Sequence, residues 1–139
     1  MTSRKKSPAK ANPASHRLES LRESVLTLHK ALIDTERMTY EQAFGTVESQ
    51  TRFLQLLITD PWFAWLHPLS ELVIAMDKAL EAEEPVTMEQ VKHLADKTRA
   101  LLKASEEGEG FERNYFEALQ RDPDVVLAHS EVTKRLNAS

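Results

Sequence analysis

The sequence contains no cysteine, and this absence excludes disulfide bonds, thiolate metal ligands and thiol nucleophiles together. It contains only three glycines, too few to build the loops that cradle phosphate groups in nucleotide-binding proteins. No apolar run approaches the roughly 20 residues that a membrane span requires. The charged start is not followed by the apolar core of a signal peptide. We therefore expect a cytoplasmic protein that does not enter the membrane.

Motifs typical of enzymes are also missing from the sequence. There is no G-x-S-x-G nucleophile elbow and no lysine in a phosphate-binding loop. Acidic residues are numerous, but a run such as Glu81, Glu83 and Glu84 is typical of a solvated surface. The sequence thus predicts a protein without enzymatic activity and without a cofactor.

Apolar residues at helical spacing dominate what is present. Five of them follow one another at intervals of three and four residues and define one face of a helix of about thirty residues that ends near Gly45: Leu18, Leu21, Val25, Leu28 and Leu32. Similar spacing continues in shorter segments, and alternation at period two is absent. For 139 residues this predicts one all-α domain, a bundle of about five or six helices.

Two Asp-Pro pairs, at residues 60–61 and 122–123, predict the starts of helices. The carboxylate accepts hydrogen bonds from free amides of the first turn, and proline has no amide to leave unpaired there. Pro68 lies seven residues into the helix that Pro61 begins, so we expect this central helix to be kinked or broken. We also expect the long first helix and the kinked helix to form the principal packing pair.

The first residues differ in composition from the rest of the chain. No acid occurs among the first thirteen residues, which carry four positively charged side chains: Arg4, Lys5, Lys6 and Lys10. We expect residues 1–14 to form a disordered basic tail and residues 15–139 to form the helical domain. The 126 residues after the first thirteen carry 14 basic and 22 acidic side chains, which argues against nucleic acid as the main ligand. Weak nucleic-acid binding through the tail is an alternative function.

An aromatic cluster in the segment DPWFAWLHPLSEL is the most distinctive local feature of the chain. Trp62, Phe63 and Trp65 lie on a helix that is apolar over more than one face, and tryptophan and phenylalanine are enriched in the cores of protein interfaces. The cluster therefore predicts a surface for a protein partner or for a homodimer. The competing interpretation is the core of a central helix, and a mixed outcome leaves Trp62 or Phe63 at the rim.

A metal-binding bundle is the other alternative that the residues allow. His67 and Glu71 form an H-x-x-x-E pair, as in a hemerythrin-like site, and the other long helices each supply one more histidine: His29, His93 and His129. The sequence lacks an H-x-x-x-H pair, and it lacks the Glu-x-x-His motif of carboxylate-bridged di-iron bundles. The competing interpretation places these histidines at the surface or at helix ends.

Two stretches resemble known proteins: LLITDPWFAWLHPLSELVIAMDKAL and GEGFERNYFEALQRDPDVVLAH. They are similar to segments of a group of short hypothetical bacterial proteins that share DPWFAWLHPLS-like and YFEALQRDPDVVLAH-like sequences. The resemblance covers roughly residues 18–136. It implies a bacterial, cytoplasmic, all-helical protein, and it brings no activity and no functional residue to this chain.

Overall fold

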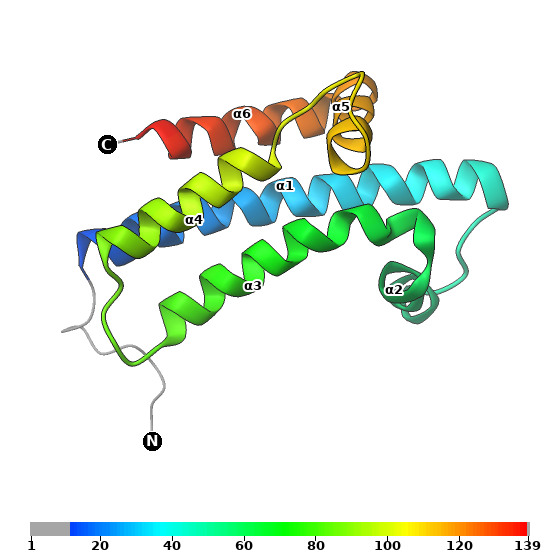
Figure 1. Ribbon diagram of the computed structural model, residues 1–139. Helices are drawn as coiled ribbons and strands as arrows, with labels where there is room; N and C mark the ends of the chain where they lie inside the picture. The colour runs from blue at the N-terminus through cyan, green and yellow to red at the C-terminus, as the bar shows by residue number, and fades with distance from the viewer. Residues whose placement is uncertain (1–11, 139) are drawn as a thin grey trace.

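A single helix, α1 (Pro13–Phe44), runs the length of the molecule in the computed structural model, which describes residues 12–138 (Figure 1). Its 32 residues span about 48 Å at 1.5 Å per residue. The predicted leucine stripe is confirmed, because all five of its members are buried against the other helices: Leu18, Leu21, Val25, Leu28 and Leu32. α1 therefore forms the axis around which the other elements pack.

The start of α1 lies slightly earlier than the sequence predicts. Asn12 is the N-cap: its Oδ1 accepts a hydrogen bond from the Ser15 amide (2.7 Å), and Ser15 Oγ accepts one from the Asn12 amide (3.0 Å). Pro13 and Ala14, which we expected in the tail, are thus helical, because this reciprocal cap holds the first turn. The rest of the expected tail, residues 1–11, lies outside the described residues.

Five further α-helices and one 3₁₀ helix complete the fold: α2 (Gln50–Thr59), η2 (Pro61–Leu66), α3 (His67–Glu81), α4 (Met88–Leu101), α5 (Phe111–Arg121) and α6 (Pro123–Asn137). The all-α prediction is confirmed, and residues 12–138 contain no strand. No helix in this part of the chain is long and apolar enough to cross a membrane.

The principal packing pair is α1 with α6, and our expectation that the kinked helix would take this place is wrong. The two helices run antiparallel. Arg121, just before α6, meets Glu36 (Nη2 to Oε2, 2.5 Å), whereas Arg135 near its end donates to the Ser20 carbonyl (2.8 Å). The 3₁₀ segment removes six residues from the expected kinked helix, so α3 is no longer than α6, at 15 residues each.

The break that Pro68 predicts is present as a change of helix type. The His67 amide still bonds in the tighter 3₁₀ pattern, to the Ala64 carbonyl three residues back, and α3 begins at His67. Pro68 has no amide and follows directly. Both Asp-Pro caps are confirmed: Asp60 Oδ1 accepts from the Trp62 amide (2.8 Å), and Asp122 Oδ1 accepts from the Asp124 amide (2.9 Å).

Candidate interaction surface

The 3₁₀ geometry of η2 decides which of its aromatic residues face solvent. Because a 3₁₀ helix has three residues per turn, side chains three apart lie on one line. Burial in η2 follows this period through two turns, with Pro61 and Ala64 exposed, Trp62 and Trp65 half-buried, and Phe63 and Leu66 buried. The two tryptophans therefore lie along one edge of η2, between its solvent side and its core side.

Phe63 belongs to the core and cannot be part of a contact surface as we had expected. Its ring is fully buried, with its centroid 5.4 Å from that of Tyr40 and 5.6 Å from that of Phe53. The expected partner surface must be redrawn without it. Two of the three residues in the predicted cluster, Trp62 and Trp65, keep part of their surface accessible.

Trp62 packs against two residues of α1 that the sequence analysis did not assign to a site. Its ring meets Tyr40 edge-on at 5.7 Å and Phe44 edge-on at 5.5 Å, and these two rings lie 4.9 Å apart. Phe44 remains 65% exposed. We call these three residues, Tyr40, Phe44 and Trp62, the aromatic corner. The spacing of Tyr40 and Phe44, four residues apart just before Gly45, was the available sequence signal.

Trp65 lies in a second ring group. Its centroid is 5.2 Å from that of Phe111 at the start of α5, and Phe111 lies 5.4 Å from the buried Tyr115. Neither indole nitrogen, of Trp62 or of Trp65, has a hydrogen-bond partner among residues 12–138, although both nitrogens are shielded from solvent. The indoles are therefore held by ring contacts and by packing against the hydrophobic core, and no ring contact joins the Trp65 group to the aromatic corner within residues 12–138.

The loop after α1 is held tightly beside the aromatic corner. Gly45 adopts φ +97°, a value that side chains with a Cβ rarely take, and so lets the chain turn away from the helix. Glu41 Oε2 then accepts hydrogen bonds from the Val47 amide (2.9 Å) and from Arg37 Nε (3.4 Å). The Val47 bond first, and Arg37 second, keep the pKa of Glu41 below its usual value.

This turn leaves a hollow of about 560 Å³ between the end of α1 and the start of α2. Tyr40 and Phe44 form its apolar wall, and Glu48 and Arg52 place one charge of each sign on its rim. The three rings of the corner are too close together for a ligand to enter between them, so binding chemistry is restricted to their outer faces and to the hollow.

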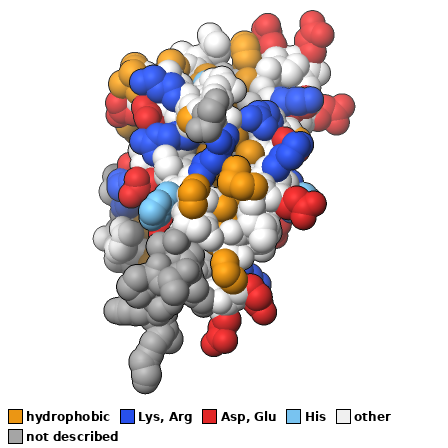
Figure 2. All heavy atoms as spheres, turned by 90° about the vertical axis from the view of Figure 1, so that its left-hand side faces the viewer, with side chains coloured by type: hydrophobic (Ala, Val, Ile, Leu, Met, Phe, Trp, Pro, Cys, Tyr) orange, Lys and Arg blue, Asp and Glu red, His pale blue; other side chains and the backbone are white. Residues whose placement is uncertain are grey.

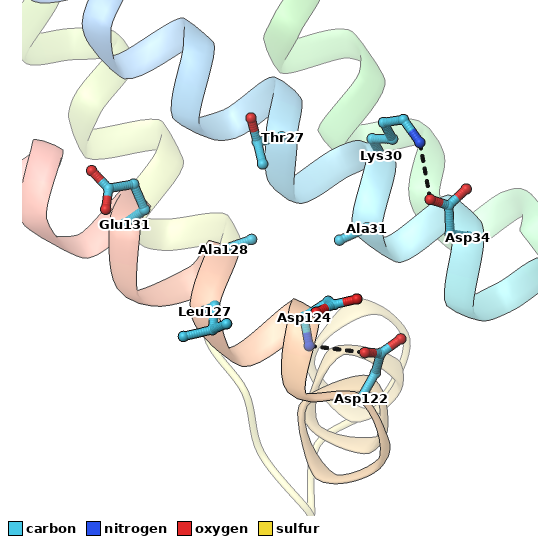
Figure 3. A pocket seen from close by; sticks show the side chains of 9 residues that line it. All are labelled: Thr27, Lys30, Ala31, Asp34, Asp122, Asp124, Leu127, Ala128 and Glu131. Atoms are coloured by element: carbon cyan, nitrogen blue, oxygen red, sulfur yellow. Dashed lines mark hydrogen bonds and ion pairs between the residues drawn. The ribbon is translucent and has the colours of Figure 1, made fainter.

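A second hollow, of about 400 Å³, lies between α1 and α6 (Figure 3). Three of its four acidic side chains, all except that of Asp124, already have internal roles. Asp34 pairs with Lys30 at 3.1 Å, Asp122 caps α6, and Glu131 pairs with Arg135 at 3.0 Å. We therefore assign no ligand to this groove.

The structure does not bring the five candidate metal ligands together. Glu71 and His93 are exposed on different helices, α3 and α4. Among residues 12–138 there is no group of three or more His, Cys, Asp or Glu side chains that could hold a metal ion. The hemerythrin-like arrangement is therefore not formed, and we do not carry it further.

The remaining three of these histidines make single local hydrogen bonds instead. Distances from the ring nitrogens are 2.7 Å from His29 Nε2 to Ser70 Oγ, 3.1 Å from His67 Nε2 to the Leu57 carbonyl, and 2.6 Å from His129 Nδ1 to Tyr115 Oη. Burial lowers the pKa of His29 and of His129, and it raises the pKa of Tyr115. The bond between His29 and Ser70 links α1 to α3, and the bond between Tyr115 and His129 links α5 to α6. The lowered pKa values favour the neutral form of both histidine rings.

Comparison with protein-family models, with curated proteins and with solved structures gave no match. What the chain is shown to be is a small all-helical protein, and no family or homologue is identified. The resemblance to short bacterial proteins stays a prediction. The alternative of nucleic-acid binding concerns the basic tail, of which residues 1–11 lie outside the described residues.

Proposed function

We propose that this protein is a non-enzymatic interaction module of the cytoplasm that self-associates through the aromatic corner. The exposure of Phe44 carries the proposal: 65% of this side chain faces solvent, although two other rings fix its position. Aromatic residues are enriched in interface cores, where they bury a large area at little cost in conformational entropy.

The three rings of the corner already contact one another without any partner. Tyr40 and Phe44 lie on the longest helix, and Trp62 follows a capped turn, so none of the three depends on a loose loop. Preorganised side chains lose little further freedom on association, and more of their contact energy remains as affinity. The hollow beside the corner, about 560 Å³, provides a recess into which a protruding partner segment can fit.

Sedimentation velocity over a concentration series tests the proposal with two full-length variants. Phe44→Ser removes the most exposed ring of the corner. Met38→Ser is the matched control, because Met38 is 57% exposed on the same helix and makes no ring contact with the corner. We expect the mass of the wild type and of Met38→Ser to rise with concentration, and that of Phe44→Ser to stay near 15.8 kDa. Equal association of all three proteins contradicts the proposal.

Tryptophan fluorescence provides a second test of self-association, measured at the aromatic corner itself. The chain has two tryptophans, so Trp65→Phe leaves Trp62 as the sole indole. We expect acrylamide quenching of Trp62 to fall as the protein concentration rises, because a bound partner covers the ring. Quenching that is independent of concentration, in a range where the mass increases, places the interface elsewhere.

A further inference from the structure

Charge is distributed unequally along the axis of the bundle. Residues 25–74 and 100–129 form the end that contains the aromatic corner, and they carry 13 acidic and 6 basic side chains. The other described residues, at the opposite end, carry 9 acidic and 8 basic side chains. Lys and Arg side chains gather across this opposite end, with acidic ones mainly at its margins (Figure 2). One end is therefore strongly acidic and the other nearly neutral.

Residues 1–11 attach to the nearly neutral end, because Asn12 caps the start of α1 there (Figure 1). This segment contains four cations and no acid: Arg4, Lys5, Lys6 and Lys10. The full chain thus joins a positively charged end to a negatively charged one. Copies of such a molecule attract each other most strongly when the positive end of one faces the negative end of the next.

From this polarity we infer that the basic segment 1–11 of one copy binds the aromatic corner of a second copy. The inference rests on the proposed function and names the partner surface for it. Lysine and arginine side chains stack favourably on the faces of aromatic rings, and the corner offers the exposed face of Phe44 and part of Trp62.

Charged groups beside the aromatic corner attract or repel the basic segment. Glu48 on the rim and Asp60 just before η2 supply negative charge, and Glu41 adds a carboxylate that already bonds Arg37 and the loop. Arg52 is the opposing cation on the rim of the hollow. The contact therefore combines ring stacking at the corner with the wider negative field of this end, and it does not depend on one ion pair.

The length of α1 excludes the same contact within one chain. From Pro13 to Phe44 the helix rises about 47 Å at 1.5 Å per residue. The chain from Pro13 back to Arg4 spans about 32 Å at most when fully extended, and even Met1 reaches only about 43 Å. Even with its side chain extended, none of the four cations reaches Phe44 of its own chain, so a cation that stacks on this ring must belong to another copy.

This contact joins two different surfaces, so a bound pair still has one free corner, on the copy that gives its segment, and one free segment, on the copy that gives its corner. Such heterologous contacts extend into longer assemblies unless the geometry closes a ring. Because the attraction is between exposed charges, salt at about 0.5 M weakens it. We expect the mass of the wild type to exceed that of a dimer at high concentration and low salt, and to fall when salt is added.

A mixing experiment with two full-length variants tests the inference. One variant loses the charges of the segment (Arg4→Gln, Lys5→Gln, Lys6→Gln, Lys10→Gln) and keeps its corner. The other is Phe44→Ser, which keeps its segment. We expect each alone to remain near 15.8 kDa at low salt. Mixed in equal amounts, they should reach about twice that mass and no more, because a single intact segment–corner pair remains.

The outcomes separate this inference from the proposed function. If the charge variant associates like the wild type while Phe44→Ser does not, the corner is the interface but the segment is not its occupant. If the two variants stay monomeric when mixed, the segment–corner contact is likewise overturned. If the wild type is monomeric at every concentration, both the inference and the proposed function fail. Both also fail if the wild type associates and Phe44→Ser associates to the same extent.

Discussion

Phe63 and Phe44 both contact Tyr40, yet only Phe63 is enclosed on all sides. Removing a fully buried ring leaves a cavity as well as losing apolar contacts. We expect Phe63→Ala to lower the free energy of unfolding by about 3–5 kcal/mol, whereas Phe44→Ala should lower it by less than about 1 kcal/mol. Urea unfolding of the two variants measures the difference. Similar losses would show that Phe44 also stabilises the monomer.

His29 and His129 make stability depend on pH in a definite direction. Burial lowers the pKa of both rings in the folded protein below the ordinary value of 6.5. The unfolded chain therefore takes up protons first as pH falls, and protonation favours unfolding. The neutral rings contribute their full stabilisation above about pH 6.5, and this is lost as pH falls from there toward the lowered pKa values of the folded state.

Urea unfolding between pH 7.5 and pH 5 measures this dependence. We expect the free energy of unfolding to decrease as the solution becomes more acidic. The decrease should be smaller in the double variant His29→Gln/His129→Gln, because glutamine does not titrate there and its side-chain amide can either donate a hydrogen bond to Tyr115 Oη or accept one from it. An identical slope in the wild type and the double variant would assign the pH dependence to other groups.

At the scale of single elements, Asp122 has a role that its neighbour Asp124 does not share. Asp122 Oδ1 accepts the amide of residue 124 and so caps α6, the main partner of α1. We expect Asp122→Ala to cost about 1 kcal/mol, as for other N-caps. Asp124→Ala, which removes an acid from the same turn but no cap, should cost less. Thermal unfolding of the pair checks the order, and the reverse order would refute the capping role.

Local sequence chemistry predicted most of the element boundaries. The leucine stripe of α1, the two Asp-Pro caps and the break at Pro68 follow from spacing and backbone rules within a few residues. The start of α1 was placed too late because the cap depends on Asn12 and Ser15 acting together. Reciprocal caps of this kind leave a fainter pattern than an apolar stripe.

Spacing and capping rules did not predict that η2 is a 3₁₀ helix, or which residues form the aromatic corner. The apolar residues of PWFAWL fit a period of 3.0 as well as one of 3.6, so spacing alone did not show that Phe63 faces inward. Phe44 lies twelve residues beyond the last member of the leucine stripe, Leu32, and spacing does not show whether it is buried. It is exposed because α1 extends beyond its neighbours there, a matter of how the elements pack.

For the whole molecule, the nine residues between α4 and α5 are a place where the backbone can be cut, to test whether packing alone holds α5 and α6 on the rest of the bundle. Residues 102–110 contain no helix and join the α5–α6 pair to the rest of the bundle. Within that pair, α6 is anchored on α1 near both of its ends, by Arg121 on Glu36 and by Arg135 on Ser20, and its Val125 and Val132 are buried. None of these contacts involves the loop.

A protease recognition site inserted after Glu107 should therefore allow the backbone to be cut without releasing either piece. We expect two bands on a denaturing gel and one peak on gel filtration after cleavage. Separation into two peaks would show that the contacts along α1 cannot by themselves retain residues 108–139. Co-elution would make this protein a natural starting point for a two-fragment reporter, reassembled from independently tagged halves.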